Sequence, residues 1–215
     1  MKKWVRWILA VVFMMVSCPS ALAYTEMVKP QEGQTIADVE TLAIGAPFYT
    51  EKEGVPTLEE YIQILNTSGA KILKGNIVTY DTVAQGIRQK TGKDVYTMGR
   101  RLAKSVFEQN VSDYADAYVV STVTMSRLTV LFFDVYRAAT NELIYSYEII
   151  LESDDPNDVK TYTEMVGKFY KNFNGSVEAQ KKEQKETAKA EQKEREKAER
   201  KAQREREKAA ERAGK

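Results

Sequence analysis

The chain has 215 residues, with 32 Lys and Arg and 31 Asp and Glu, which gives a formal net charge of +1 at pH 7. It contains no histidine, so catalytic triads with a histidine base and metal sites with histidine ligands are excluded. The near-zero total conceals two unlike segments, because residues 24–180 carry a net charge of −7 and residues 181–215 a net charge of +5. The overall charge therefore says little about which partners the protein binds.

Residues 1–23 have the organisation of a secretory signal peptide. A segment with three basic residues precedes an apolar run over residues 7–16, and residues 21–23 (Ala-Leu-Ala) form a small-x-small cleavage site. The apolar run is too short to span a bilayer, which needs about 20 apolar residues. We therefore predict export to the periplasm or another extracytoplasmic compartment of a bacterium, with cleavage after Ala23 and no transmembrane helix in the mature chain.

Two alternatives stay open for this segment. The first is an N-terminal anchor helix that is never cleaved, and the second is lipidation of Cys18, the only cysteine. The residues before Cys18 lack the usual leucine of a lipidation site, and a proline follows it. Cleavage after Ala23 leaves a mature chain without a thiol, and therefore without a disulfide or a cysteine-based zinc or iron–sulfur site.

The first part of the mature chain leads into a strand and a helix. Residues 24–38 are polar and are expected to form an extended lead-in without a core. Residues 39–48 alternate weakly between polar and apolar side chains and predict a first strand. Thr57 and Glu60 have the spacing of a capping box, which predicts the start of a helix, and residues 76–80 predict a second strand.

Two helices are expected next. Asp81 or Thr82 is placed to cap a short helix, and Asp94 is placed to cap a longer one. Apolar side chains recur at helical spacing along one side of the longer helix, at Val95, Met98, Leu102, Val106 and Val111. This is the clearest amphipathic helix that the sequence predicts.

Three strands are expected after these helices. Residues 117–125 are rich in β-branched side chains, and residues 128–136 are apolar on both faces through Phe133, so we expect a central strand that is covered on both sides. Residues 140–142 (Thr-Asn-Glu) predict a turn, in which asparagine tolerates a positive φ. Residues 143–151 then predict the return strand of a hairpin.

A final packed helix completes the predicted domain, with apolar side chains at Val159, Tyr162, Met165, Val166, Phe169, Tyr170 and Phe173. The order of elements predicts one α/β (α+β) domain over residues 39–175, with a single mixed sheet of about five strands and helices packed on it. Residues 176–215 follow as a charged tail of alanine, glutamate, lysine and arginine, either as a long helix or as a disordered segment.

The tail has an unusual composition. From residue 181 onward its only apolar residues are seven alanines, which excludes a dimeric coiled coil. Pairs at i,i+4 spacing such as Glu196–Arg200 favour a solvated single helix of about 50 Å. The tail is then either a frayed charge run without a role, or a spacer or electrostatic tether in which Arg195, Arg200 and Arg204 contact an anionic surface. Nucleic acid is not expected as a partner, because the tail lacks aromatic side chains for base stacking.

Few residues of the domain suggest a site. Asp134 ends an apolar run, and we expect this carboxylate to pair with Arg137 or to accept backbone N–H groups, with a catalytic role as the alternative. Tyr145 and Tyr147 lie on one face of the predicted return strand, where they either pack in the core or form a recognition surface for a partner or glycan. No catalytic residue, metal site or cofactor is predicted.

Three short segments of the domain carry a resemblance: residues 114–120 (YADAYVV), 133–136 (FDVY) and 140–142 (TNE). Together they resemble a family of bacterial envelope domains that includes the N-terminal domain of TolB, the lipoprotein activators of penicillin-binding proteins and the curli secretion-channel protein. In that family an Ala-Asp-Tyr/Ala step, here at Asp116, opens a strand after a helix. A strand ending in Asp then precedes a Thr-Gly-Glu-like turn, where this chain has Asn141 in place of glycine. The resemblance implies a non-catalytic α/β domain that docks another envelope component.

The sequence thus predicts an exported, non-enzymatic envelope protein that acts as a binding or docking module for an envelope protein partner or an anionic envelope surface, with a basic helical tail as spacer or tether. One alternative is an envelope hydrolase that uses Asp, Glu, Lys or Tyr chemistry, which requires a deep pocket with convergent acidic groups around Asp134. Another is a structural protein that adds a strand to the sheet of a partner, which requires an exposed edge strand.

Overall fold

The computed structural model describes residues 24–31, 33–73, 76–152 and 157–213, with side chains for all of these except Pro30 and residues 202–213. The predicted signal peptide, its cleavage after Ala23 and the lipidation alternative at Cys18 therefore lie outside the described residues. The strands are β1 (Tyr24–Pro30), β2 (Leu42–Ile44), β3 (Ile77–Val78), β4 (Ala117–Met125), β5 (Thr129–Arg137) and β6 (Leu143–Leu151). The helices are α2 (Leu58–Ile72), α3 (Tyr80–Thr91), α4 (Arg100–Asn110), the short 3₁₀ helix η1 (Val111–Asp113) and α5 (Val159–Ala213).

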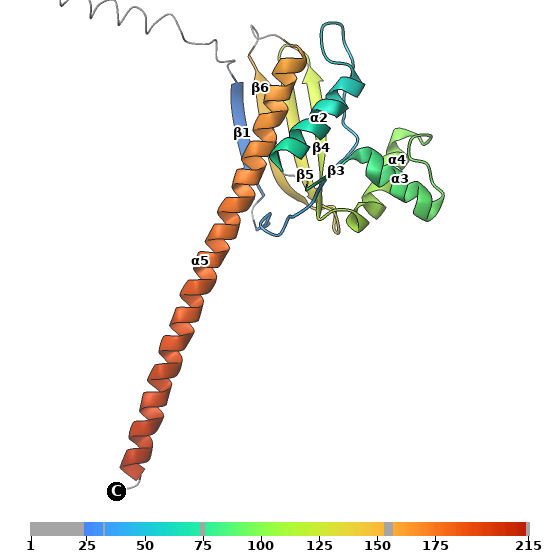
Figure 1. The fold of residues 1–215 in the computed structure, drawn as a ribbon. Helices are drawn as coiled ribbons and strands as arrows, with labels where there is room; N and C mark the ends of the chain where they lie inside the picture. The colour runs from blue at the N-terminus through green and yellow to red at the C-terminus, as the bar shows by residue number, and fades with distance from the viewer. Residues whose placement is uncertain (1–23, 32, 74–75, 153–156, 214–215) are drawn as a thin grey trace, which may run out of the picture.

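The strands form one mixed sheet in the order β1-β6-β5-β4-β2-β3. The pairs β1–β6, β6–β5 and β5–β4 are antiparallel, whereas β2 is parallel to both β4 and β3. Helices pack on this sheet and α5 extends far beyond it, so the predicted α/β fold with a long C-terminal helix is confirmed (Figure 1). β4 and β6 have the predicted bounds, whereas β2 occupies only three residues of the strand predicted over residues 39–48.

The first described strand differs from its prediction. Residues 24–38 were expected as a lead-in without a core, but β1 pairs with β6 along its whole length and Ile36 is only 2% exposed. With this strand, the described residues form a sheet of six strands, close to the predicted five. The segment lacks apolar alternation because an edge strand is held mainly by backbone hydrogen bonds, and these leave no pattern in the side chains.

One face of the sheet is covered by α2 and α5, which lie side by side on it (Figure 1). The centre of this interface is the ring of Phe169 on α5, which stacks on Phe133 of β5 with centroids 4.3 Å apart. Tyr147 of β6 and Phe173 of the same helix also pack against Phe169, at 5.9 and 6.1 Å between centroids. The larger apolar core of the protein is therefore centred on aromatic contacts between α5 and the sheet.

The opposite face of the sheet is covered only at one end. There α3 and α4 pack over β2 and β4 and form a second, smaller apolar cluster around Phe107 and Tyr118. In β5 the side chains alternate between buried ones beneath α5 and half-buried ones on the opposite face, such as Phe132 and Asp134. The prediction that this strand is covered on both sides is therefore wrong, because apolar side chains on the second face are shielded only in part.

Two local predictions are confirmed by the backbone. Thr57 accepts a hydrogen bond from the Glu60 N–H, and the Glu60 carboxylate accepts one from the Thr57 N–H, which completes the capping box of α2. Asn141 has a φ of 58° in the turn between β5 and β6. Both features follow from short-range side-chain chemistry, which a sequence shows directly.

The starts of α3 and α4 differ from their predictions. Thr79, and not Asp81 or Thr82, caps α3, since its hydroxyl accepts the Thr82 N–H at 3.2 Å. α4 begins at Arg100 and not just after Asp94, because the residues between them form turns. Gly99 stands at the N-cap of α4 and supplies no side-chain hydrogen bond.

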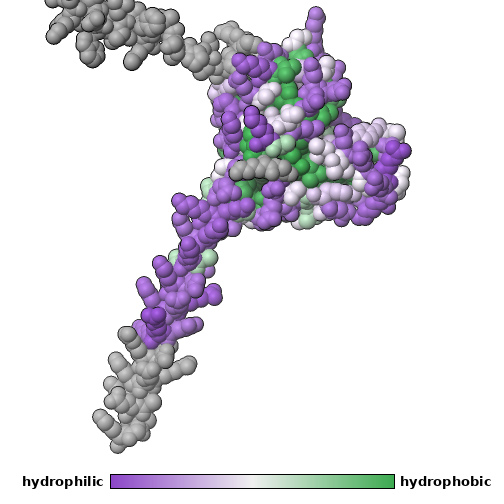
Figure 2. All heavy atoms as spheres, viewed as in Figure 1, coloured by the Kyte–Doolittle hydropathy of each residue, from purple (hydrophilic) through white to green (hydrophobic). Residues whose placement is uncertain are grey.

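The last helix joins the domain to the tail without a break. α5 starts on the covered face of the sheet and continues through the charged segment. Val177, at 5% exposed, is its last residue in the main core. One turn further on, the Gln180 side chain accepts the Ile36 N–H at 2.8 Å, and the Gln184 side chain donates to Thr35 at 3.1 Å. Beyond Gln184 the helix projects from the domain, and its described side chains are predominantly hydrophilic (Figures 1 and 2).

We expect Phe169→Ala to lower the free energy of unfolding by about 3–5 kcal/mol, because it removes the ring that stacks on Phe133 and leaves a cavity. Urea denaturation followed by circular dichroism measures this change. Leu102→Ala serves as the control, since Leu102 is 57% exposed and its truncation should change stability by no more than about 0.5 kcal/mol. Equal effects of the two substitutions would contradict a core centred on Phe169.

The Glu26 carboxylate links β1 to α5 and predicts a pH dependence of stability. It receives hydrogen bonds from Lys168, from the Tyr147 hydroxyl at 2.6 Å and from Asn172 at 3.2 Å. Burial by itself raises the pKa of Glu26, but these donors more than offset it, so the pKa lies below its ordinary value of 4.5. A carboxyl with a lowered folded-state pKa stabilises the fold above its unfolded-state pKa, and this stabilisation is lost as the pH falls through the folded-state value.

Glu26→Gln should therefore reduce the loss of stability that the protein shows as the pH falls below about 4.5. Urea midpoints measured over a series of pH values test this expectation. Glu191→Gln, on the exposed part of α5, should keep the pH dependence of the unsubstituted protein. Parallel curves for Glu26→Gln and the unsubstituted protein would show that the contact between β1 and α5 does not depend on this charge.

Candidate functional site

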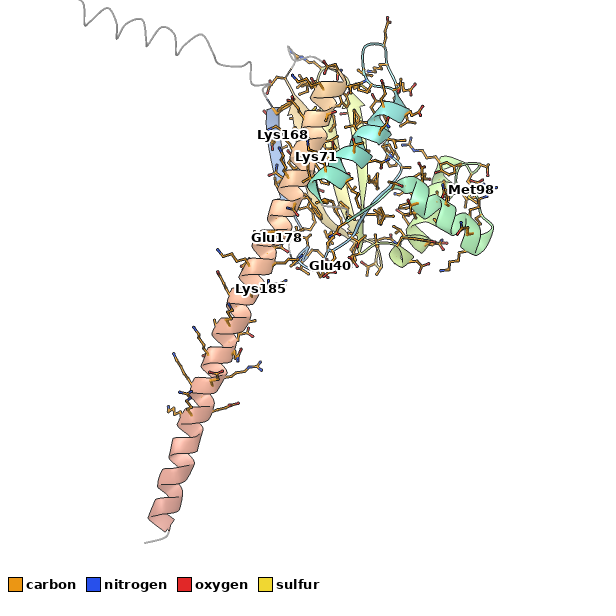
Figure 3. All side chains as sticks on the ribbon, viewed as in Figure 1. Glu40, Lys71, Met98, Lys168, Glu178 and Lys185 are labelled. Atoms are coloured by element: carbon orange, nitrogen blue, oxygen red, sulfur yellow. The ribbon has the colours of Figure 1, made fainter. Side chains whose placement is uncertain are left out.

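Residues 80–113, which contain α3, α4 and η1, form a lobe that we call the α3–α4 lobe. An apolar pocket lies between this lobe and the sheet, on the face that α5 does not cover. Its volume is about 240 Å³, and its walls include Phe48, Tyr80, Met98, Phe107 and Tyr118. Met98 lies in the α3–α4 lobe, on the side of the domain away from α5 (Figure 3). We call this cavity the α4 pocket, and it is the candidate functional site of the protein.

The aromatic walls of the α4 pocket are positioned by three different elements. Tyr80 is the first residue of α3, Phe107 lies on α4 and Tyr118 lies on β4. Phe107 stacks on Tyr80 with centroids 5.4 Å apart and meets Tyr118 edge-on at 5.7 Å. These contacts place the three rings against one another along the wall of the pocket.

A loop after β2 supplies the remaining aromatic wall. The N–H of Phe48 donates to the carbonyl of Ser121 on β4 at 2.7 Å, which aligns this loop alongside β4. The guanidinium of Arg100, at the start of α4, lies 3.8 Å from the centroid of the Phe48 ring. A cation–π contact of this kind brings a positive charge to the edge of an apolar cavity.

The other end of the α4 pocket carries a polar cluster. Glu108 pairs with Lys104 at 3.5 Å and accepts a hydrogen bond from the Tyr118 hydroxyl at 3.3 Å. The same hydroxyl donates to the Asn141 side chain at 3.0 Å. Burial raises the pKa of Tyr118, and the nearby Glu108 charge raises it further, so Tyr118 is a neutral hydrogen-bond donor and not a base at neutral pH.

Asp134 is not part of the α4 pocket. It lies half-buried on the same face of the sheet, where the Ser146 hydroxyl of β6 donates to its carboxylate at 2.6 Å. Arg137, one of its expected partners, pairs instead with Asp38 at 2.8 Å. The predicted partner of Asp134 is therefore wrong. The register between β5 and β6 places the Ser146 hydroxyl opposite Asp134, and the residues around Asp134 in the sequence do not show this register.

Tyr145 and Tyr147 lie in the core between the sheet and α5. They are 0% and 1% exposed, and Tyr145 meets Phe173 of α5 edge-on at 5.3 Å between centroids. The Tyr147 hydroxyl donates to Glu26 at 2.6 Å. Of the two roles considered for this pair, the structure thus shows core packing, because α5 separates both rings from any partner.

The three arginines of the tail are far from the other candidate residues. Arg195 and Arg200 are exposed on the projecting part of α5, and Arg204 lies on the same helix with a side chain outside the described ones. α5 projects away from the domain, so these residues do not meet Asp134 or the α4 pocket (Figure 1).

The described residues form neither a candidate metal site nor a membrane-spanning helix. Within residues 24–213, apart from the short gaps, no three His, Cys, Asp or Glu side chains gather in a way that could hold a metal ion. Across the same described part of the chain, no helix has the length and apolar character needed to cross a membrane.

The aspartate that carried the family resemblance has a structural role. Asp116, just before β4, accepts hydrogen bonds from the N–H groups of Glu40 and Thr41 at 3.0 and 2.8 Å. It therefore ties the segment before β2 to the start of β4, which are parallel neighbours in the sheet. A residue with this function supports a fold and does not by itself indicate a ligand.

The α4 pocket was missed by the sequence reasoning, although part of its signal was visible. Met98 was placed on the expected amphipathic helix, but the sequence does not show that Phe48, from a loop, and Tyr118, from a strand, converge with it. Convergence of residues from separate elements depends on the sheet order, with β2 inserted between β3 and β4.

No protein-family model and no curated protein matches this chain. Among solved structures, a PelC dodecamer from Paraburkholderia phytofirmans has a TM-score of 0.42 and 10% identity, covering 69% of this chain and 97% of that one. The LpoB C-terminal domain from Escherichia coli has a TM-score of 0.41 and 16% identity, covering 57% and 87%. The same domain from Salmonella enterica has a TM-score of 0.41 and 17% identity, covering 56% and 87%. These are low similarities in fold, and they indicate no ligand or partner for this chain.

We expect Tyr118→Phe to destabilise the protein by about 1 kcal/mol, because it removes the hydroxyl that donates to Asn141 and Glu108 while keeping the ring in the pocket wall. Thermal unfolding measures the loss of stability, and a crystal structure of the variant shows whether the ring stays in the pocket wall. A loss above about 3 kcal/mol would mean that the ring itself had moved, since the substitution removes no apolar surface.

Proposed function

We propose that the protein is an exported, non-enzymatic binding module of the bacterial cell envelope, in which the α/β domain docks another envelope component and the charged part of α5 is a spacer and electrostatic tether. The observation that carries this proposal is the continuity of α5 from the aromatic core into the projecting helix. A helix that is anchored in the core at one end holds the domain at a set distance and direction from whatever its other end contacts.

The composition of the projecting helix suits this role. Lysine occurs at every fourth position through residues 181, 185, 189, 193, 197 and 201, and glutamates lie between these lysines. Lys182 and Glu186 approach to 3.9 Å, and pairs of this kind stabilise a solvated helix by about 0.2–0.5 kcal/mol each. From Gln184 to Ala213 the helix extends about 45 Å at 1.5 Å per residue.

Its charge favours an anionic surface as the contact of the tether. Residues 181–215 carry a net charge of +5, whereas residues 24–180 carry −7. Electrostatic attraction in physiological salt decays over about 8 Å, and most of the projecting helix is farther than this from the domain. The far end of the tail is therefore not neutralised by its own domain and acts as an independent basic segment.

The hydrolase alternative receives little support from the site. The α4 pocket is lined by a single carboxylate, Glu108, which already pairs with Lys104. Asp134 lies outside this pocket and is bound by the Ser146 hydroxyl. The convergent acidic groups that the hydrolase alternative requires are therefore not found in the α4 pocket.

A second docking mode is favoured by the edge of the sheet. β1 is an edge strand of seven residues with exposed side chains, including Met27 at 40% exposed. Among the described residues, only β6 pairs with residues 25–29 of this strand, so their other side meets the requirement for strand addition. A photo-reactive amino acid at Met27 should cross-link a partner protein in intact cells, whereas one at Tyr96, on the α3–α4 lobe, should not. Cross-links at Tyr96 alone would exclude docking through β1.

The tether is tested by charge-changing variants of the full-length chain on vesicles that contain about one third anionic lipid. Replacing Arg195, Arg200 and Arg204 by glutamine should weaken binding at low salt by roughly tenfold or more, because each basic residue near an anionic membrane contributes about 1 kcal/mol. High salt should remove the difference by screening. Co-sedimentation at two salt concentrations measures both effects.

The matched control replaces Glu191, Glu194 and Glu199 by glutamine, which changes the same helix by the same number of charges in the opposite direction. This variant should bind at least as tightly as the unsubstituted protein. Equal affinities for both variants, or binding that is insensitive to salt, would exclude the electrostatic tether and leave only the spacer.

A further inference from the structure

The α4 pocket has apolar walls that no side chain of the domain fills. Four aromatic rings, those of Phe48, Tyr80, Phe107 and Tyr118, surround a volume of about 240 Å³. Small-molecule pockets are commonly about 300–1,000 Å³, so this volume suits a compact ligand of about ten non-hydrogen atoms. The lining of the pocket is predominantly apolar, which favours its occupation by an apolar group.

Positive charge is concentrated at one end of the pocket. Arg100 and Arg101 occupy the first turn of α4, which has no acidic residue in that turn and no side-chain hydrogen bond at its N-cap, Gly99. The N-terminus of a helix is itself positive, so these two cations repel it and each other unless an anion is nearby. An anion that enters the pocket at this end relieves that repulsion.

The guanidinium of Arg100 is available to such an anion. Its contact is with the face of the Phe48 ring at 3.8 Å, and it pairs with no carboxylate in the described part of the chain. Lys104, in contrast, already pairs with Glu108. Glu108 follows Arg100 by eight residues, which is about 12 Å along the helix, so the negative charge lies at the opposite end of the cavity.

We infer from this arrangement that the α4 pocket binds a small amphiphilic carboxylate of about ten non-hydrogen atoms in all, with the carboxylate at Arg100 and the apolar body among Phe48, Tyr80 and Phe107. The apolar body gains by leaving water, and the guanidinium supplies a charge-assisted hydrogen bond that sets the orientation. The inference goes beyond the proposed docking function and does not depend on it, since neither β1 nor the tail lines this pocket.

The test uses three probes of equal chain length and different charge: octanoate, octanol and octylamine. Titrations of the full-length protein at pH 7, followed by calorimetry and by the methyl NMR signal of Met98, measure their affinities. Octanoate should bind more tightly than octanol by about tenfold, and octylamine should bind most weakly. The Met98 methyl signal should shift on binding, while that of Met27 on β1 should not.

Two substitutions and one control locate the site. Arg100→Gln should weaken octanoate binding by about tenfold and leave octanol binding within about twofold, because only the charged contact is lost. Arg101→Gln removes the same charge one residue along, outside the pocket lining, and should change octanoate binding by less than about threefold. Ala103→Phe places a ring in the cavity and should abolish binding of all three probes.

Folding of each variant is checked by its thermal unfolding, and the titration of the unsubstituted protein does not depend on any variant. The inference is overturned if octylamine or octanol binds as tightly as octanoate. It is also overturned if Arg100→Gln and Arg101→Gln have the same effect, or if octanoate leaves the Met98 signal unchanged.

Discussion

The stacking of Phe169 on Phe133 is the contact on which the rest of the structure depends. It attaches α5 to the centre of the sheet, and α2 packs beside α5 on the same face. The Glu26 carboxylate of β1 then reaches Lys168, one residue before the stacked ring. One aromatic contact thus anchors α5 on the covered face, from where the helix contacts β1 through Lys168 and leaves the domain as the charged tail.

Because α5 occupies one face, the binding features lie elsewhere. The opposite face is covered only at one end by the α3–α4 lobe, and the α4 pocket is the space that remains between this lobe and the sheet. Its cationic end belongs to Arg100, and its acidic end to Glu108, on a single helix. The domain therefore separates two tasks in space, with support on the α5 face and candidate recognition on the other.

How much could be predicted varied with the range of the interaction. The bounds of β4 and β6, the capping box at Thr57 and the positive φ of Asn141 depend on neighbours within a few residues, and the sequence predicted them. β1 was missed because backbone pairing with β6 leaves no side-chain pattern. The start of α4 at Arg100 was misplaced because turns after Asp94 compete with the helix for the same residues.

From the sequence alone it was possible to determine the fold class, the charge division between domain and tail, and the lack of histidine and of apolar side chains in that tail, because these follow from composition and local periodicity. The tertiary structure alone decided that Tyr145 and Tyr147 are core residues, that Asp134 meets Ser146, and that four aromatic rings enclose a pocket beside Arg100. The reason is physical: burial and convergence depend on which distant segments become neighbours. Strand order and packing decide which segments become neighbours. Many residues contribute to both, so no short sequence pattern is sufficient to predict them.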